Sequence, residues 1–267
     1  MGGNAPARNL VETCIMNPTA CLLVIGNEIL SGRTQDVNVQ YIARRLSETG
    51  ITLSEVRIIP DIRAVIVRNV TEARAAYDNV FTTGGIGPTH DDITSACVAE
   101  SFGVPWVHHP ETFRLLEAHF PPNEFNPARQ RMATMPQGAV PIRNSVSVAP
   151  GFTMGNVHVM AGVPRIMRAM FEEVLPTLPH GTPVISRAWH ANGLYEGTLA
   201  AGLETIQQRH PDIDIGSYPY RLDESCRGVC LLCKGTDVEG VKAASDAVRD
   251  LIERLGFTPQ AGEPVKG

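Results

Sequence analysis

The spacing of apolar residues in the first third of the chain predicts alternating strands and helices. The continuous apolar run Ala20–Ile25, which ends at Gly26, is typical of a strand that is covered on both faces. Apolar residues then recur at helical spacing up to Gly50, a residue that favours a helix end. The predicted order is strand, loop, helix, strand, helix, strand, over residues 20–25, 27–36, 38–49, 51–59, 62–74 and 79–83. This alternation predicts an α/β fold with a mostly parallel sheet and helices on both of its faces.

The pattern changes after residue 92. Helices are predicted over residues 93–102, 111–120, 127–135 and 164–175, and strands over residues 140–148 and 152–161. A turn at Gly155-Asn156 favours a β-hairpin that lies beside the main sheet. Residues 176–183 are rich in proline and glycine, which predicts a linker.

The sequence therefore divides into three parts. We expect a disordered tail, an α/β domain and a small second domain, over residues 1–19, 20–176 and 184–257. In the last of these, strands begin at residues 184, 213 and 228, and helices are predicted over residues 196–209 and 238–255. This order of elements is typical of a small α+β domain.

Composition narrows the range of partners. The net charge of −5 provides no general attraction to phosphate backbones, and no basic patch interrupts it. No apolar stretch approaches the ~20 residues that a membrane-spanning helix needs, and the N-terminal residues lack the apolar segment of a secretory signal. We therefore expect a cytoplasmic protein whose partner is a small molecule, with no binding to nucleic acid or membrane.

The chain contains six cysteines, which are too few and too unevenly placed for a disulfide framework. Cys226, Cys230 and Cys233 have a spacing that can hold an iron–sulfur cluster. Their segment is typical of a buried strand, in which Cys226 and Cys230 face one way and Cys233 faces the other. The pattern therefore favours small apolar core residues over a cluster.

The loop Thr83–Asp92 has the clearest chemical signal. It joins a strand to a helix at the carboxyl edge of the predicted sheet, where open α/β sheets bind ligands. Gly84, Gly85 and Gly87 carry no side chain, so main-chain amides can turn toward a phosphate near the positive end of the following helix. The loop lacks the lysine of a Walker loop and the third glycine of a dinucleotide fingerprint. We therefore predict a different kind of site for a phosphorylated small molecule.

The acidic residues of this loop leave two interpretations open. Asp91 and Asp92 would repel a phosphate unless one caps the helix and the other contacts a metal ion or ligand hydroxyl groups. A helix cap formed by Thr89 and Asp92 would explain that spacing without any ligand. Three glycines are not needed for a cap but are needed for close approach of a ligand to the backbone, so we favour a ligand site. His90 has no visible partner for proton transfer.

Several motifs, in order, resemble those of the molybdopterin-binding domain superfamily of MoaB and Mog, and in particular the first part of the competence/damage-inducible protein A family, CinA. The G-D-E-[IL]-L segment, the T-G-G-[LI]-G-P-T-x-D-D-x-T loop and the A-P-G-F segment of these families resemble Gly26–Leu30, Thr83–Thr94 and Ala149–Phe152. Gly193–Glu196 and Ile215–Pro219 resemble signatures of the small domain that follows. The resemblance covers about residues 20–255.

The resemblance implies a three-layer α/β domain that self-associates as a homo-oligomer and holds its ligand between the loops after the first and third strands. Enzymes of this group that insert molybdenum or adenylylate molybdopterin use acidic residues at positions matching Asp92 and Asp61. CinA-type domains, and a similar domain of some eukaryotic FAD synthases, resemble metal-dependent pyrophosphatases that act on ADP-ribose or FAD. Asn27 stands where the family usually has an aspartate, which removes one charged contact to a metal ion or hydroxyl group.

Together these observations define a candidate site. Asp92 and Asp61 are the candidate catalytic residues, and Asp92 and Glu28 are the candidate ligands of a divalent metal ion such as Mg²⁺. The residues expected to bind the ligand are Gly26, Glu28, Asn38, Gly84, Gly85, Gly87, Pro88, Thr89 and Asp91. An ordinary loop carboxylate is an equal explanation for Glu28, and helix caps would explain Asp61 and Asn38.

Three functions stay open at this point. The first is a metal-dependent nucleotide pyrophosphatase that acts on ADP-ribose or FAD. The second is a protein of molybdenum cofactor biosynthesis that binds or adenylylates molybdopterin. The third is a module that binds a nucleotide or pterin without turnover.

Overall fold

The computed structural model describes residues 17–121, 123–223 and 226–264. It divides into two compact units, of which the first ends at Gly181 and the second begins at Thr182. The predicted domains, residues 20–176 and 184–257, each fall within one unit. Residues 1–16 of the predicted tail lie outside the described residues, and the first strand already includes Thr19.

The first unit is built on a six-stranded sheet with the order β2-β1-β3-β8-β7-β6. Its strands are β1 (Thr19–Ile25), β2 (Thr52–Ile59), β3 (Asn79–Thr83), β6 (Val140–Ile142), β7 (Gly151–Met154) and β8 (Val157–Met160). Parallel pairing joins β2 to β1, β1 to β3 and β3 to β8, whereas β7 is antiparallel to both β8 and β6. The prediction of a mostly parallel sheet is therefore confirmed.

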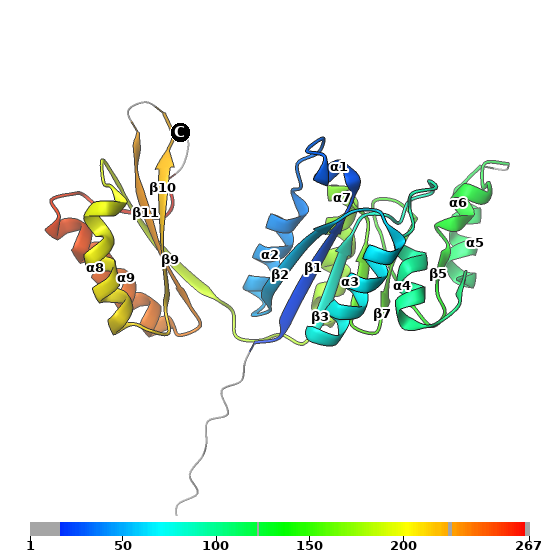
Figure 1. Cartoon of the computed structure of the whole chain (residues 1–267), viewed down its shortest axis with the longest axis horizontal. Coiled ribbons are helices and arrows are strands. Elements are labelled where there is room, and N and C mark those ends of the chain that lie inside the picture. Colours follow the sequence, from blue (N-terminus) through cyan, green and yellow to red (C-terminus); the bar gives the residue numbers. More distant parts are fainter. Residues whose placement is uncertain (1–16, 122, 224–225, 265–267) are drawn as a thin grey trace, which may run out of the picture. The chain divides into compact units, whose positions relative to one another are not determined.

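Helices cover both faces of this sheet. α2 (Asn38–Glu48) leads from β1 to β2, and α3 (Arg63–Ala76) leads back from β2 past β1 to β3. Since such crossovers are right-handed, helices that run in opposite directions across a sheet lie on opposite faces. α7 (Pro164–Val174) shares the face of α2, and α4 (Thr94–Phe102) shares the face of α3 (Figure 1). The first unit thus has the three layers that the family resemblance implied.

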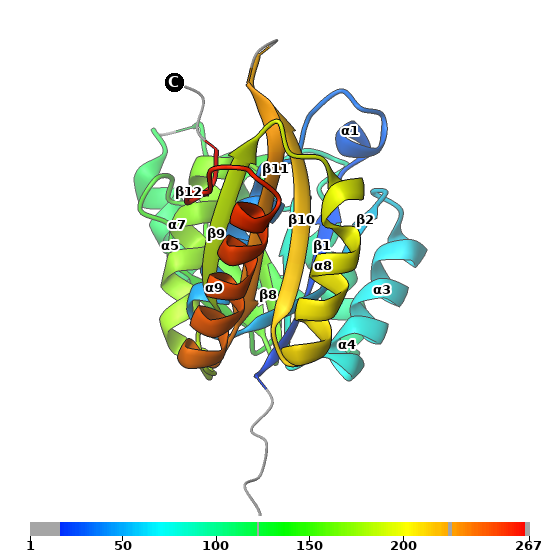
Figure 2. The ribbon, with the colours of Figure 1, turned by 90° about the vertical axis from the view of Figure 1, so that its left-hand side faces the viewer.

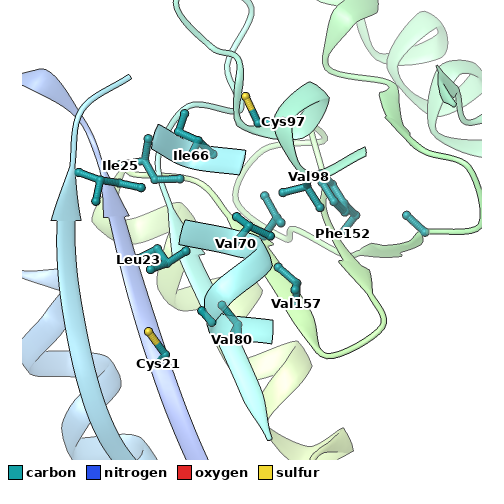
Figure 3. Close-up of a cluster of buried hydrophobic side chains, with 14 of the residues drawn as sticks. Cys21, Leu23, Ile25, Ile66, Val70, Val80, Cys97, Val98, Phe152 and Val157 are labelled. Atoms are coloured by element: carbon teal, nitrogen blue, oxygen red, sulfur yellow. The ribbon is translucent and has the colours of Figure 1, made fainter. Parts of the chain in front are cut away.

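Alternate residues of β1 enter two separate cores. Cys21, Leu23 and Ile25 pack toward α3 and α4 (Figure 3), while Leu22 and Val24 pack toward α2 and α7. None of these five side chains is more than 2% exposed. The uninterrupted apolar run in the sequence follows from this position, because a central strand between two helical layers has no polar face.

The shorter elements differ from the sequence prediction. α1 (Asn27–Leu30) lies within the segment expected to be a loop. α6 (Pro127–Arg131) ends four residues before the predicted end, because the residues before Pro136 favour an extended backbone. They form β5 (Thr134–Pro136), which pairs with β4 (Trp106–His108). The remaining helical segments of this unit are α5 (Pro110–His119) and a 3₁₀ turn at Leu175–Thr177.

The predicted hairpin has a different place from the one expected. The predicted strand over residues 140–148 is limited to β6, and residues 152–161 form not one strand but two, β7 and β8, joined by the expected Gly155-Asn156 turn. This hairpin belongs to the main sheet rather than lying beside it, because β8 pairs directly with β3. β8 therefore brings its carboxyl end next to the carboxyl end of β3.

The second unit is a four-stranded antiparallel sheet with the order β10-β11-β9-β12. Its elements are β9 (Ile185–Asn192), α8 (Glu196–Arg209), β10 (Asp214–Arg221), β11 (Arg227–Gly235), α9 (Val238–Arg254) and β12 (Gln260–Ala261). Figure 2 shows α8 and α9 side by side over one face of this sheet. The small α+β domain is therefore present as predicted.

Two of the three spaced cysteines lie on β11 and point to opposite faces of the sheet. Cys233 is fully buried in the core between sheet and helices, where burial raises the pKa of its thiol to about 11. Cys230 is 5% exposed, and Cys226 precedes the strand. Among the described residues, no group of three His, Cys, Asp or Glu side chains is arranged to hold a metal ion. The interpretation as core residues is confirmed for Cys230 and Cys233 and is wrong for Cys226, which is half-buried and lies outside the strand.

In the part of the chain that the structure describes, no helix combines the length and apolar character needed to cross a bilayer.

Candidate functional site

The candidate site lies where the order of the strands reverses. The chain leaves β1 on one side toward β2 and returns on the other side to β3, and such a switch point opens a crevice at the carboxyl ends of the strands. Gly26 and Gly84 directly follow β1 and β3, and Gly162 lies two residues after β8. A Cβ atom on Gly84 would lie 2.1 Å from the carbonyl oxygen of Ile25, and one on Gly162 would lie 3.3 Å from the Cα of Gly84. The three strand ends are therefore packed backbone against backbone.

A cleft of about 540 Å³ opens above these strand ends. This volume is in the range that holds a drug-sized or cofactor-sized ligand. Six of the residues predicted from the sequence line it: Glu28, Gly84, Gly85, Gly87, Pro88 and Asp92. The opposite wall consists of mostly apolar residues around Ala149-Pro150 and Gly162–Pro164. The loops after β1, β3 and β8 thus meet at one cavity.

The glycine-rich loop presents free main-chain donors at this cleft. The amide of Gly84 donates to the carbonyl of Met160 at 3.1 Å, and the carbonyl of Gly85 accepts from the amide of Thr94 at 3.0 Å. Within the described residues, no hydrogen bond uses the amides of Gly85, Ile86 or Gly87. All three of these residues line the cleft. Consecutive unpaired amides of this kind can bind an anion.

Asp92 closes the loop instead of capping the helix. Its Oδ2 accepts hydrogen bonds from the amide of Thr89 at 2.8 Å and from the Thr89 hydroxyl at 2.5 Å. α4 begins two residues later, at Thr94, and Ile93 before it makes no side-chain cap. The interpretation of Thr89 and Asp92 as a helix cap is therefore wrong. The Oδ1 atom of Asp92 has no hydrogen-bond partner among the described residues, so one carboxylate oxygen is available at the cleft.

A group of carboxylates lies at the same edge of the sheet. Oδ2 of Asp61 accepts a hydrogen bond from the amide of Asn27 at 2.8 Å, which ties the segment after β2 to α1. Burial raises the pKa of the Asp61 carboxyl, and the nearby charges of Glu28 and Asp91 raise it further. Asp61 does not line the cleft, whereas Glu28 does. Asp61 therefore lies behind the α1 loop, and Glu28 lies at the cavity itself.

Asn38 links the start of α2 to the loop after β8 and does not cap its own helix. It is 4% exposed at the first position of α2, and its Nδ2 donates to the carbonyl of Gly162 at 2.8 Å. The amide of Val39 is satisfied by Asp36, so the explanation of Asn38 as a cap is wrong. Asn38 holds the loop after β8 in place below the cleft, and its Oδ1 is buried without a partner.

The remaining predicted residues lie at the rim or behind the cleft wall. Thr89 and Asp91 are exposed and do not line the cavity, and the side chain of His90 is 97% exposed. Gly26 is buried, and a Cβ atom there would lie 2.7 Å from both carboxylate oxygens of Glu28. Gly26 therefore makes room for the Glu28 side chain.

Arg131 is a charged residue near the site that no sequence motif marks as a candidate. Arg131, the last residue of α6, donates from Nη2 to the carbonyl oxygen of Asp92 at 3.2 Å. These two residues are 39 positions apart. The contact arises only from folding, and no local motif around Arg131 marks it.

The available donors fit a divalent cation held together with a phosphorylated ligand. Mg²⁺ bound to nucleotides is commonly held by one or two carboxylates, with phosphate oxygens and water completing its shell. Glu28 and Asp92 line the same cleft, and one oxygen of Asp92 is unused.

Comparison with protein families gives a match for each unit. The family described as probable molybdopterin binding domain matches residues 21–180, and the family described as FAD synthase, middle domain, matches residues 183–260. The first match begins within β1 and extends to one residue before the end of the first unit. The second match covers the small antiparallel sheet and its helices.

Individual relatives agree with these matches. A protein of Archaeoglobus fulgidus is 32% identical over 231 residues, which cover 86% of this chain and 96% of that protein. A CinA-like protein of Myxococcus xanthus is 33% identical over 216 residues, covering 73% of this chain and 50% of the relative, so this chain spans half of its length.

A solved structure supports the same assignment for the fold. The crystal structure of CinA from Thermoplasma acidophilum, described as a protein with unknown function, superposes with a TM-score of 0.57 at 29% identity. It covers 60% of this chain and 97% of that one. The chain therefore belongs to the molybdopterin-binding domain family, and it combines a CinA-like domain of that family with a domain similar to the middle domain of FAD synthase.

Proposed function

We propose that the cleft is the active site of a metal-dependent nucleotide pyrophosphatase that acts on a dinucleotide of the ADP-ribose or FAD type. The observation that carries the proposal is the meeting of two features in one cavity. Unpaired amides from Gly85 to Gly87 offer an anion site, and the carboxylates of Glu28 and Asp92 lie beside it. The match of the second unit to an FAD synthase domain supports a nucleotide as ligand.

Hydrolysis of a pyrophosphate needs three things from the site. Phosphate charge must be neutralised, a water molecule must be placed in line with the bond that breaks, and the leaving oxygen must be stabilised. A divalent ion held by Glu28 and Asp92 would supply charge neutralisation there. The amides of Gly85 to Gly87 hold one phosphate in place, and Asp92 orients the attacking water. The oxygen of that water bonds to one phosphorus while the bridging P–O bond breaks. The water gives up its proton to the solvent, and AMP and a second monophosphate leave.

The proposal is tested by product analysis of the purified protein. Incubated with ADP-ribose or FAD and Mg²⁺ or Mn²⁺, the wild type is expected to release AMP, detected by chromatography, and release should stop when the metal is chelated. The Asp92→Asn variant is expected to lose activity by about a hundredfold or more. An amide oxygen can still accept both hydrogen bonds from Thr89, so this variant keeps the loop closed while it removes the charge.

Asp212→Asn is a matched control, because Asp212 is exposed in the second unit and its side chain makes no hydrogen bond or ion pair with any described residue. It should keep full activity. Failure of the wild type to release AMP with every ion would contradict the proposal. ATP-dependent adenylylation of a bound pterin would then assign the site to molybdenum cofactor biosynthesis, as the family of the first unit suggests. A rise of the melting temperature with nucleotide, without turnover, would identify a binding module.

A further inference from the structure

The positive charge of Arg131 has no evident role in stabilising α6. The helix is short and is held at its start by Asn126, whose side chain accepts from the amide of Arg129 at 3.0 Å. Arg129, on the same helix, is fully engaged: its Nη1 donates to the carboxylate of Glu124 at 2.8 Å, and its guanidinium stacks 4.3 Å from the ring of Phe120. Among the described residues, the half-buried side chain of Arg131 makes a single hydrogen bond, to the carbonyl of Asp92, and no ion pair.

The position of this free charge matters because the cleft is otherwise acidic. Glu28 and Asp92 line it, and Asp61 lies close enough to Glu28 and to Asp91 for their charges to interact. Main-chain amides alone carry only partial positive charge, which is weak against several carboxylates. An anion that binds here needs further positive charge from the protein or from a metal ion.

Arg131 is placed to supply that charge. A small hollow next to the main cleft is lined by Arg131 together with Gly87 and Asp92, and both of these also line the main cleft. Among the described residues that line either cavity, Arg131 is the one with a positive charge. The hollow is about 20 Å³, enough for one water molecule, so a ligand must lie in the main cleft and meet the guanidinium along the shared wall.

We propose that Arg131 is a phosphate-binding residue of this cleft, which pairs with a phosphate held by the amides of Ile86 and Gly87. A guanidinium has five N–H donors in a planar fork that suits phosphate oxygens. One donor fixes the group to the Asp92 carbonyl, and the other donors face no partner among the described residues. The inference rests on the proposed function for the identity of the ligand, but it concerns binding and not hydrolysis.

The test is a binding titration without divalent ions, using adenosine, AMP and ADP-ribose as probes. Arg131→Met keeps the length of the side chain and removes the charge. It is expected to weaken binding of AMP and ADP-ribose by about tenfold to a hundredfold while leaving adenosine unchanged. Arg131→Lys restores the positive charge without the planar guanidinium and should recover part of the lost affinity. The difference in affinity between wild type and Arg131→Met should shrink at high salt. Arg129→Met is the matched control and should bind all three probes like the wild type.

The outcomes separate this inference from the proposed function. If Arg131 only supports the Asp92 carbonyl, Arg131→Met will weaken adenosine and AMP equally and without salt dependence, which overturns the inference. Equal affinity of wild type and Arg131→Met for AMP overturns it as well. If Arg131→Met loses affinity only for the phosphate compounds and the wild type hydrolyses none of them, the result supports phosphate binding by Arg131 and contradicts the pyrophosphatase proposal. A wild type that binds no phosphate compound contradicts both.

Discussion

Replacing Gly84 with alanine is expected to lower the free energy of unfolding of the first unit by about 3 to 5 kcal/mol. The φ angle of Gly84 is +101°, a region that residues with a side chain rarely adopt. An added Cβ atom would lie 2.1 Å from the carbonyl oxygen of Ile25. Because the obstacle is the main chain of a central strand, no side chain can rotate away to relieve the clash.

Urea unfolding can be followed for this unit alone. The chain has two tryptophans, Trp106 in the first unit and Trp189 in the second, so a Trp189→Phe background reports the first unit through Trp106 fluorescence. Gly32→Ala is the matched control. Gly32 also has a positive φ, +71°, but nothing lies within 4 Å of an added Cβ atom, so only the backbone cost of about 1 kcal/mol is expected. Equal losses for the two variants would show that the contact with Ile25 is unimportant.

These contacts change the explanation of the glycine-rich loop. From the sequence alone, the glycines of this loop are explained by close approach of a ligand to the backbone. In the structure, Gly84 is required by the strand end of β1, and a Cβ atom on Gly85 would lie 2.2 Å from the buried hydroxyl oxygen of Thr94. Of the three glycines, Gly87 is the one that borders the candidate carboxylate of Asp92, which an added Cβ atom would meet at 2.6 Å. The first two glycines therefore have an internal reason to be present, whether or not a ligand binds.

The larger elements of the fold could be predicted because their signal is local. β1 is apolar throughout since both of its faces are covered, and α2 and α7 each show one apolar stripe that packs on the sheet. The resemblance to the molybdopterin-binding domain family also implied that the loops after β1 and β3 would meet. For this reason Glu28, Gly85 and Asp92 could be placed in one site from the sequence, and all three line the cleft.

The elements that were missed depend on contacts between distant parts of the chain. β4 and β5 have three residues each and are stabilised by each other, so neither has a periodic pattern of its own. The contact of Arg131 with Asp92 spans 39 residues and depends on where α6 ends. The role of Asn38 was also hidden, because its partner, the carbonyl of Gly162, follows β8 late in the sequence. Local spacing identifies such residues only as possible helix caps.

The second prediction with a large expected effect concerns a histidine in the middle of the main sheet. His158 on β8 is 4% exposed and stacks on Phe81 of β3, with 5.1 Å between the ring centroids. Nδ1 lies 3.0 Å from the hydroxyl oxygen of Thr153, and Nε2 is buried without a hydrogen-bond partner among the described residues. Burial lowers the pKa of His158 from 6.5 to about 4, and no charged group contributes to the shift. The imidazole is therefore neutral in the folded protein at physiological pH.

This depressed pKa makes the first unit sensitive to acid. Between pH 6.5 and about pH 4 the unfolded chain binds a proton on His158 and the folded chain does not, so the free energy of unfolding falls as the pH falls. The loss from this residue should reach about 2 kcal/mol at pH 5 relative to pH 7.5, and about 3 kcal/mol near pH 4. Below that pH the folded protein also binds the proton, and the loss from His158 grows no further.

The contribution of His158 can be separated from that of other titrating groups, including the carboxylates at the cleft. The quantity to compare between wild type and variant is the slope of the free energy of unfolding against pH. Urea unfolding of the wild type and of His158→Gln, measured by Trp106 fluorescence from pH 7.5 to pH 5, should show a slope smaller by close to one proton in the variant. The slope is informative even if His158→Gln is less stable at every pH, because a packing defect shifts the whole curve without changing its slope. His90→Gln, which alters an imidazole that is 97% exposed, should keep the wild-type slope. If His158→Gln keeps that slope too, the imidazole takes up its proton at the same pH in the folded and the unfolded chain, and burial does not lower its pKa.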